Sequence, residues 1–308
     1  MHTSGLQHPL PNGEGVDPTG VYVLGMHRSG TSAATRVVNL LGVPTTGNEG
    51  LLPPAPLNPT GFWESAALND VNDEILCRFG GDSANPPRLS PGWEFDPGLG
   101  DLPVRADRCF LRTFTTAQWV WKDPRNCLTF PFWRRVTRAK PVALIVYRNP
   151  LEVAASLLAH HAVPKSAALP LWERYVSDSL THARGLPTYV VGYADIISAP
   201  AAAAAKLHRF LSRRGLQLSA LDTVTDRVSC FIRADLRHYQ VDPEDLARDQ
   251  GLTASQRQLF TWLERCRGAH SCLPTGPPGF GSSGESTVDE TQPTTCQDAV
   301  TTSPRSDR

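Results

Sequence analysis

One glycine-containing segment near the N-terminus constrains the fold more than any other part of the chain. An apolar run rich in β-branched residues, Val21–Gly25, leads through a second glycine, Gly30, into a helical pattern over Thr31–Leu41. A strand, a glycine loop and a helix in this order form an anion cradle, because the loop N–H groups and the positive end of the helix dipole converge. The predicted anion-binding residues of this loop are His27, Arg28, Ser29, Gly30, Thr31 and Ser32.

The loop differs from an ATP-binding Walker A loop, which has Lys immediately after its second glycine. Here Thr31 takes that place, and the permanent cation is Arg28, two residues before Gly30. The apolar run Pro141–Tyr147 is followed by Arg148 and lacks the Asp of a Walker B strand. Both differences count against an ATP- and magnesium-dependent phosphotransferase, which stays open as an alternative.

A second segment supplies the other half of the predicted site. Pro141–Tyr147 carries no charge and is predicted to be a buried strand. Arg148 leaves the end of this strand, Pro150 stands where a helix can begin, and Ser156 lies eight residues after Arg148. Because eight residues exceed two helical turns, both side chains can touch one ligand only if Arg148 reaches along the helix.

Together the two segments resemble the sulfotransferases that use 3'-phosphoadenosine 5'-phosphosulfate (PAPS). The resemblance implies that the loop from Arg28 to Thr31 holds the 5'-phosphosulfate and that Arg148 and Ser156 hold the 3'-phosphate. It also implies PAPS as the co-substrate and no metal. The similarity extends over about residues 21–214 and is strongest at the two phosphate motifs.

A third segment agrees with this resemblance. The short strand candidate Trp119–Trp121 is followed by Lys122, which matches the lysine that reaches the sulfuryl group in the family. Cytosolic members have a catalytic His two places after this lysine, but here that place holds Pro124, which cannot take a proton. The resemblance therefore implies a base from elsewhere, as in the carbohydrate and protein-tyrosine sulfotransferases, which use a Glu after the first helix.

Two glutamates are candidates for the base, Glu64 and Glu49. We prefer Glu64 as the catalytic residue beside Lys122 and Arg28, because Phe62 and Trp63 are expected to shield it and raise its pKa. The alternative is a structural carboxylate at the N-terminus of the next helix.

Several other residues keep two interpretations. His27 contacts the ligand or only packs locally, and Asp123 orients a neighbouring cation or caps the following helix. Arg233 and Arg237 lie where the family's C-terminal loop closes over the nucleotide, but the Arg-Lys-Gly motif of cytosolic enzymes is absent. Surface charge is the alternative for both arginines.

Composition excludes some partners and compartments. The 30 basic and 30 acidic residues balance, so the sequence predicts no nucleic-acid partner. The seven cysteines include no Cys-x-x-Cys pair, which favours the cytoplasm, and Cys266, His270 and Cys272 lack a fourth metal ligand. The chain has no apolar run of about 18 residues for a membrane span, and Met1–Gly20 does not resemble a signal peptide.

Apolar strand candidates alternate with helical patterns, which predicts a parallel sheet with helices on both faces. We therefore expect an α/β, three-layer, P-loop-like fold with its ligand at the carboxyl ends of the strands. The predicted parts are a disordered N-terminus (1–18), a sulfotransferase domain (19–267) and a flexible low-complexity tail (268–308). The predicted strands are Val21–Gly25, Trp119–Trp121, Pro141–Tyr147 and Thr188–Tyr193, and the predicted helices include Thr31–Leu41, Ser65–Phe79, Pro150–His161, Ala168–Arg184 and Pro200–Arg214.

The predicted activity is transfer of a sulfuryl group from PAPS to a hydroxyl or amine of a small-molecule, glycan or lipid acceptor. Besides the phosphotransferase, a nucleotide-binding protein without turnover is an alternative, in which Pro124 marks a lost base. The irregular region 44–105, rich in Pro, Gly and aromatic residues, is expected to serve both as packing and as an acceptor pocket.

Overall fold

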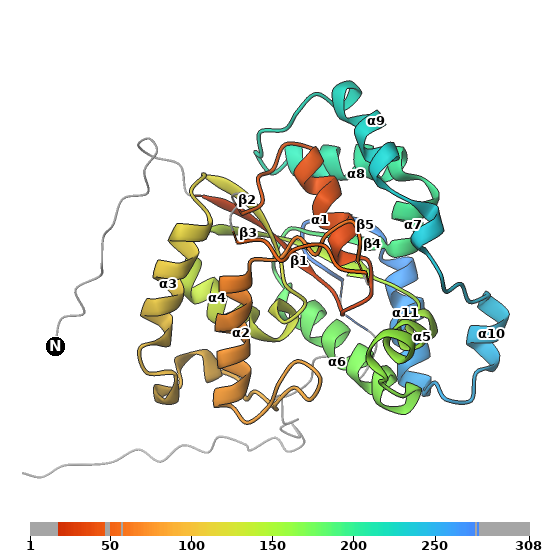
Figure 1. Ribbon diagram of the computed structural model, residues 1–308, viewed down its shortest axis with the longest axis horizontal. Helices are drawn as coiled ribbons and strands as arrows, with labels where there is room; N and C mark the ends of the chain where they lie inside the picture. Colours follow the sequence, from red (N-terminus) through yellow and green to blue (C-terminus); the bar gives the residue numbers. More distant parts are fainter. Residues whose placement is uncertain (1–17, 47–49, 57, 275, 277–308) are drawn as a thin grey trace, which may run out of the picture.

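The computed structural model describes residues 18–46, 50–56, 58–274 and 276, and these form an α/β, three-layer, P-loop-like fold (Figure 1). A five-stranded sheet has the order β2-β1-β3-β4-β5. The first four strands run parallel, and β5 joins the edge antiparallel to β4. The strands are β1 (Thr19–Leu24), β2 (Gln118–Lys122), β3 (Lys140–Tyr147), β4 (Thr188–Gly192) and β5 (Gly268–His270).

The two central strands are apolar on both faces because each face packs on its own core. Along β1, Tyr22 and Leu24 enter one hydrophobic cluster, whereas Val21 and Val23 enter the other. Strand β3 alternates in the same way over residues 142–147. A period of two along a strand therefore separates one apolar run into two buried faces, as expected for a sheet covered on both sides.

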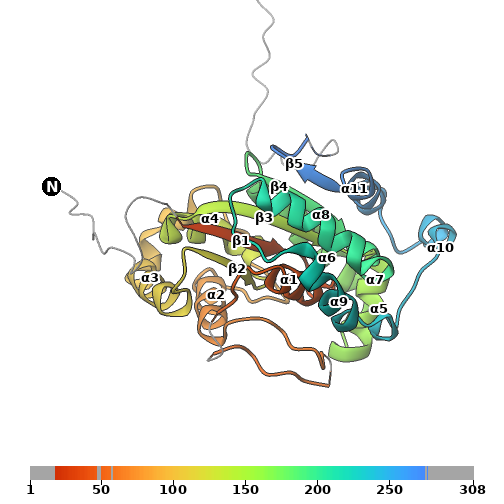
Figure 2. The same ribbon diagram turned by 90° about the horizontal axis from the view of Figure 1, so that it is seen from above.

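Helices cover both faces of the sheet (Figure 1, Figure 2). The core that contains Val21 is closed by α1 (Thr31–Leu40), α7 (Tyr193–Ser198), α8 (Pro200–Ser212) and α9 (Leu221–Phe231). The core that contains Tyr22 is closed by α2 (Ala66–Arg78), α3 (Leu102–Thr113), α4 (Asn126–Thr137), α5 (Pro150–His161), α6 (Lys165–His182) and α11 (Ala254–Arg265). The remaining elements are α10 (Pro243–Arg248) and the 3-10 turns η1 (Trp93–Phe95), η2 (Pro97–Leu99) and η3 (Ala234–Leu236).

The predicted fold class is confirmed, with some differences in detail. Strand β4 ends at Gly192, and Tyr193, predicted as its last residue, begins α7. Helix α6 begins at Lys165, three residues before the predicted start at Ala168. The predicted helices do not include α3, α4, α7, α9, α10 and α11. Of these, α4 contains an internal proline, Pro131, which disfavours a helix.

The sheet continues past residue 267, where the sequence predicts the end of the domain. Residues Gly268–His270 form β5, which pairs antiparallel with β4. Leu273 is also buried against the core. Residues 1–17 of the predicted disordered segment 1–18 and most of the predicted tail 268–308 lie outside the described residues.

The strand order places a switch point between β1 and β3. The chain leaves β1 for β2 on one side, then crosses to β3 on the other side of β1. In open sheets of this kind the ligand lies at the carboxyl ends of the strands beside such a switch point. The two strands approach closely there, since a Cβ at Gly25 would lie 2.3 Å from the carbonyl oxygen of Val146. Glycine is therefore required at the end of β1.

Candidate active site

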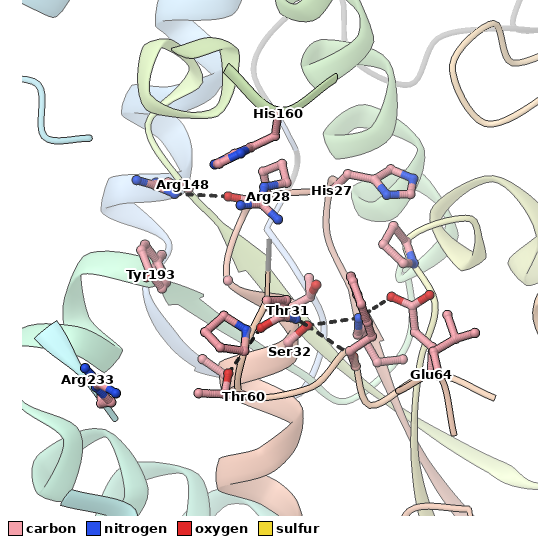
Figure 3. A pocket seen from close by; sticks show the side chains of 18 of the residues that line it. His27, Arg28, Thr31, Ser32, Thr60, Glu64, Arg148, His160, Tyr193 and Arg233 are labelled. Atoms are coloured by element: carbon pink, nitrogen blue, oxygen red, sulfur yellow. Dashed lines mark hydrogen bonds and ion pairs between the residues drawn. The ribbon is translucent and has the colours of Figure 1, made fainter. Parts of the chain in front are cut away.

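A pocket of about 380 Å³ opens at the carboxyl ends of β1, β2 and β3 (Figure 3). Among the described residues that line it, Glu64 is the only carboxylate. Five lining residues carry a permanent positive charge, Arg28, Lys122, Arg125, Arg148 and Arg233. A pocket with this balance attracts an anionic ligand, because the surrounding protein lowers the local dielectric and strengthens the field of the cations.

The glycine loop has the backbone shape of an anion cradle. Arg28 (φ 67°) and Gly30 (φ 86°) both adopt left-handed conformations, and Gly30 precedes the first residue of α1 without a side-chain cap. A Cβ at Gly30 would lie 2.1 Å from Cδ2 of Tyr193. Ser29 is fully buried, does not line the pocket, and its Oγ has no hydrogen-bond partner in the described part of the chain. The Ser29 side chain therefore does not reach the pocket in this arrangement, and its contact with a ligand stays a prediction.

The structure brings Arg28, Arg148 and Ser156 together, as the sequence predicts, but with different partners. Nε of Arg28 donates to Oγ of Ser156 at 2.9 Å, and Arg148 donates to the backbone oxygen of Arg28 at 3.3 Å. Ser156 is buried and does not line the pocket, whereas both arginines do. Ser156 thus supports Arg28 directly, and the contact of Arg148 and Ser156 with one 3'-phosphate stays a prediction.

Arg148 is held by three groups that the sequence analysis did not identify. Its Nε donates to Oε2 of Glu152 at 2.7 Å, one terminal nitrogen donates to the backbone oxygen of Tyr239 at 2.9 Å, and the guanidinium lies 4.7 Å from the ring centre of Tyr193. Glu152 follows Arg148 by four residues, so an acidic residue one helical turn away is the sequence signal for this contact. The Tyr239 contact joins distant segments and leaves no local pattern.

Lys122 and Glu64 form a buried ion pair that reaches the glycine loop. Their side chains are 2% and 9% exposed. Nζ of Lys122 also donates to Oγ of Ser32 at 3.1 Å, and Ser32 in turn donates to the backbone oxygen of Phe62. Nδ2 of Asn69 donates to Oε2 of Glu64 at 2.7 Å. The pair therefore connects the end of β2, the start of α1 and the segment before α2.

The environment of Glu64 differs from the sequence prediction. Burial raises its pKa, but the charge and hydrogen bond of Lys122, together with the hydrogen bond from Asn69, outweigh burial and hold the pKa below its ordinary value. The predicted increase is therefore wrong for the free protein. Glu64 is also not the helix cap, since Oγ of Ser65 accepts from the N–H of Leu68 at the start of α2. Glu49, the other candidate base, lies outside the described residues.

His27 lines the pocket and also packs. Its ring contacts Tyr175 edge to face, with ring centres 5.6 Å apart. Burial lowers the pKa of His27 to about 3, so the imidazole is neutral at physiological pH. The positive charge of the pocket therefore comes from arginine and lysine and not from this histidine.

Asp123 is fully buried below the pocket and orients Arg125, one of the two roles predicted for it. Its Oδ1 accepts from the N–H of Arg125 at 2.9 Å and from the guanidinium at 3.1 Å, and its Oδ2 accepts from Asn72 at 2.7 Å. Burial raises the pKa of Asp123 to about 6, although Arg125 opposes this shift. Arg125 is thereby held at the pocket wall.

The two late arginines have different surroundings. Arg233 lines the pocket and pairs with the exposed Asp235, whereas Arg237 does not line it and pairs with the buried Glu152. In the described part of the chain, which includes Cys266, His270 and Cys272, no group of three or more His, Cys, Asp or Glu side chains is arranged to hold a metal ion. No helix among the described residues is long and apolar enough to span a membrane.

Comparison of the chain with protein-family models and with curated proteins finds no match. Among solved structures, it is similar to the sulfotransferase domain of the olefin synthase from Synechococcus PCC 7002, with 16% sequence identity, 82% of this chain and 90% of that chain covered, and a TM-score of 0.41. It is also similar to sulfotransferase STF9 from Mycobacterium avium, with 15% identity, 82% and 78% of the two chains covered, and a TM-score of 0.42.

Proposed function

We propose that the protein transfers a sulfuryl group from PAPS to a hydroxyl or amine of a small-molecule, glycan or lipid acceptor. The observation that carries this proposal is the convergence of Arg28, Arg148 and Lys122 on one pocket whose only described carboxylate is Glu64. The donor has two widely separated anionic groups, and Arg28, Lys122 and Arg148 each lie at or just after the end of a different strand.

The proposed donor site uses the charged and apolar sides of the pocket differently. The glycine loop and Lys122 receive the 5'-phosphosulfate, and Arg148 receives the 3'-phosphate. The apolar residues Phe231, Ile232 and Ile197 line the same pocket and provide a surface for the adenosine. Charge-assisted hydrogen bonds to phosphate oxygens are among the strongest available to a protein, and the loop N–H groups add to them.

In the proposed reaction, the acceptor oxygen or nitrogen attacks sulfur and forms a new bond to it. The bond between sulfur and the bridging oxygen of the 5'-phosphate breaks, and 3',5'-ADP leaves with the electron pair. Glu64 takes the proton of the acceptor. Lys122 stabilises the negative charge that develops on the bridging oxygen, and such preorganised charge usually provides the largest part of catalysis.

The ion pair gives Glu64 two states in this proposal. Paired with Lys122, the carboxylate is a weak base, because its pKa is held low. When Lys122 turns to the bridging oxygen of the bound donor, Glu64 loses its main counter-charge while its burial remains. Its pKa then rises toward the working range of a general base. Binding of the donor would thus activate the base.

The acceptor is proposed to enter beside Glu64, where Leu52 and Pro56 from the irregular region contribute to the pocket lining. We also propose a cytoplasmic location, because the six cysteines in the described part of the chain are free thiols, as expected in a reducing compartment.

The test is calorimetric titration with 3',5'-ADP, and separately with ATP and magnesium, of the wild type and of Arg148→Ala. We expect selective binding of 3',5'-ADP that the substitution weakens by about ten-fold or more, the order for a lost charge-assisted hydrogen bond. Preference for ATP with magnesium would overturn the proposal in favour of a phosphotransferase. Tight 3',5'-ADP binding without transfer to any acceptor would favour a binding protein without turnover.

A further inference from the structure

Glu152, on the first turn of α5, is a buried carboxylate that the proposed reaction does not use. It is 1% exposed and does not line the pocket. Its Oε2 accepts from Nε of Arg148 at 2.7 Å. Its Oε1 accepts from the guanidinium of Arg237 at 2.7 Å and from the N–H of Val241 at 3.3 Å. A buried carboxylate is costly unless it is paired, and these three partners offset that cost for Glu152.

The partners of Glu152 come from two parts of the chain that are far apart in sequence. Arg148 follows β3, whereas Arg237 and Val241 belong to the segment 232–241 between α9 and α10. A terminal nitrogen of Arg148 donates to the backbone oxygen of Tyr239 in the same segment. One carboxylate and one arginine therefore fasten this segment to the end of the central strand.

The fastened segment forms one wall of the pocket, through Ile232, Arg233 and His238. In Figure 3, Arg148 and Arg233 lie on the same side of the pocket as Tyr193. Glu152 and Arg148 contact this segment through Arg237, Tyr239 and Val241.

Glu152 also limits how Arg148 can bind a ligand. A guanidinium has five N–H donors in a fixed plane. Three of those in Arg148 point to Glu152, to the backbone oxygen of Arg28 and to the backbone oxygen of Tyr239. The other two N–H groups have no hydrogen-bond partner among the described residues and are available to the pocket, and the contact at Nε fixes the plane in which they point.

We propose that Glu152 is a positioning residue with two effects on the donor site. It orients Arg148 toward the 3'-phosphate of the donor, and it holds the segment 232–241 in place as a wall of the pocket. This inference rests on the proposed function for its first effect, whereas the second concerns the protein without any ligand.

The first arm of the test compares wild type and Glu152→Gln by calorimetry with 3',5'-ADP and with 5'-AMP, which lacks the 3'-phosphate. The dissociation constant for 5'-AMP divided by that for 3',5'-ADP measures recognition of the 3'-phosphate. We expect Glu152→Gln to reduce this ratio by about ten-fold, the order for a charge-assisted hydrogen bond, and to change 5'-AMP binding by much less. A purely structural defect would weaken the binding of both ligands by a similar factor, and this result would overturn the first effect.

The second arm measures hydrogen exchange of the segment 232–241 in the absence of ligand. We expect Glu152→Gln and Arg237→Ala to accelerate exchange in this segment, since both break the contact that fastens it. Glu244→Gln is the matched control, because Glu244 pairs with Arg248 on the surface of α10, with side chains 76% and 75% exposed. This control should leave both the exchange and the ratio unchanged.

The outcomes separate this inference from the proposed function. If the wild type shows no preference for 3',5'-ADP over 5'-AMP, the proposed function fails, and the first effect fails with it. If the wild type has the preference and Glu152→Gln keeps both the preference and the slow exchange, only the inference is overturned. Should Glu152→Gln fail to fold, Glu152→Asp keeps the charge with a shorter reach and is expected to show a smaller loss in both arms.

Discussion

At the scale of single residues, the buried pair of Lys122 and Glu64 gives a prediction that is independent of function. In Lys122→Met, Glu64 keeps its burial but loses its counter-charge, so we expect its pKa to rise above the ordinary value. A carboxyl with a raised folded-state pKa destabilises the protein as pH rises through that pKa. The free energy of unfolding of the variant, measured by urea unfolding, should therefore be lower than that of the wild type by about 3–5 kcal/mol at pH 8 and by less at pH 5.

The double variant Lys122→Met/Glu64→Gln is the control for this prediction. It removes both charges, so it should recover much of the lost stability and show no added pH dependence between pH 5 and 8. Equal destabilisation of the single variant at both pH values would contradict a buried, ionised Glu64.

Glu64 alone gives a prediction about activity. Glu64→Gln keeps the shape of the side chain but cannot take a proton, and general bases contribute about 10²–10⁴-fold to a rate. We expect kcat to fall by that order with PAPS and a competent acceptor, while the dissociation constant for 3',5'-ADP changes by less than about three-fold, since Lys122 still reaches Ser32. Unchanged kcat would exclude Glu64 as the base.

Gly30 tests the shape of the loop. Gly30→Ala meets both a left-handed backbone (φ 86°) and a contact of 2.1 Å with Tyr193. Gly185→Ala is the matched control, with φ 73° and nothing within 4 Å of the added Cβ. We expect the control substitution to lower the free energy of unfolding by about 1 kcal/mol, from backbone strain alone. Gly30→Ala should cost more, and calorimetric melting of both variants measures the difference; equal costs would contradict the close approach of Tyr193.

At the scale of secondary-structure elements, the sequence predicts what is periodic or locally marked. The strands β1 and β3 contain continuous apolar runs, and Gly30 and Pro150 mark the starts of the helices that follow them. Helix α4 was not predicted; Pro131 lies inside it and disfavours a helix locally, whereas its buried residues pack against the core.

In the candidate site too, the sequence predicts the residues that carry a local pattern and not the contacts between distant segments. Loop residues and strand ends carry local patterns, so Arg28, Lys122 and Arg148 were identified. The contacts of Asn69 with Glu64 and of Tyr239 with Arg148 depend on tertiary structure. The direction of the pKa shift of Glu64 could not be predicted either, because it depends on which opposing effect is larger once Lys122 is in contact.

Asn72 connects helix α2 to helix α4, and this connection can be tested. It is fully buried in α2, donates to Asp123 and Asn126, and accepts from Thr129 and Trp133 of α4. Asn72→Leu would leave several buried polar groups without this partner, each costing about 1–3 kcal/mol. We expect the free energy of unfolding to fall by about 2–5 kcal/mol in urea titration, whereas a loss below about 1 kcal/mol would show that the network rearranges.

At the scale of the whole molecule, the distribution of charge matters more than its total. The chain has a net charge of zero, yet its pocket is lined by five permanent cations and one described carboxylate. Composition therefore excludes a generally basic surface but gives no information about a local field. That field arises because parallel strands bring Arg28, Lys122 and Arg148, far apart in sequence, to one edge of the sheet.

The extent of the domain provides the last prediction. A chain that ends at Arg267 lacks β5, which pairs with β4, and Leu273, which is 8% exposed and packs on the core. A chain that ends at residue 276 keeps both. Loss of the strand pairing and of one buried leucine should lower the free energy of unfolding by about 2–4 kcal/mol in the shorter chain. The chain that ends at residue 276 should have a free energy of unfolding within about 0.5 kcal/mol of that of the full chain, because residues 277–308 contain few large apolar side chains to bury. Urea unfolding of the three proteins measures both effects. Equal stability of the two truncated chains would mean that β5 contributes little to stability and that the domain ends at residue 267. A marked loss of stability in the chain that ends at residue 276 would place part of the domain beyond that residue.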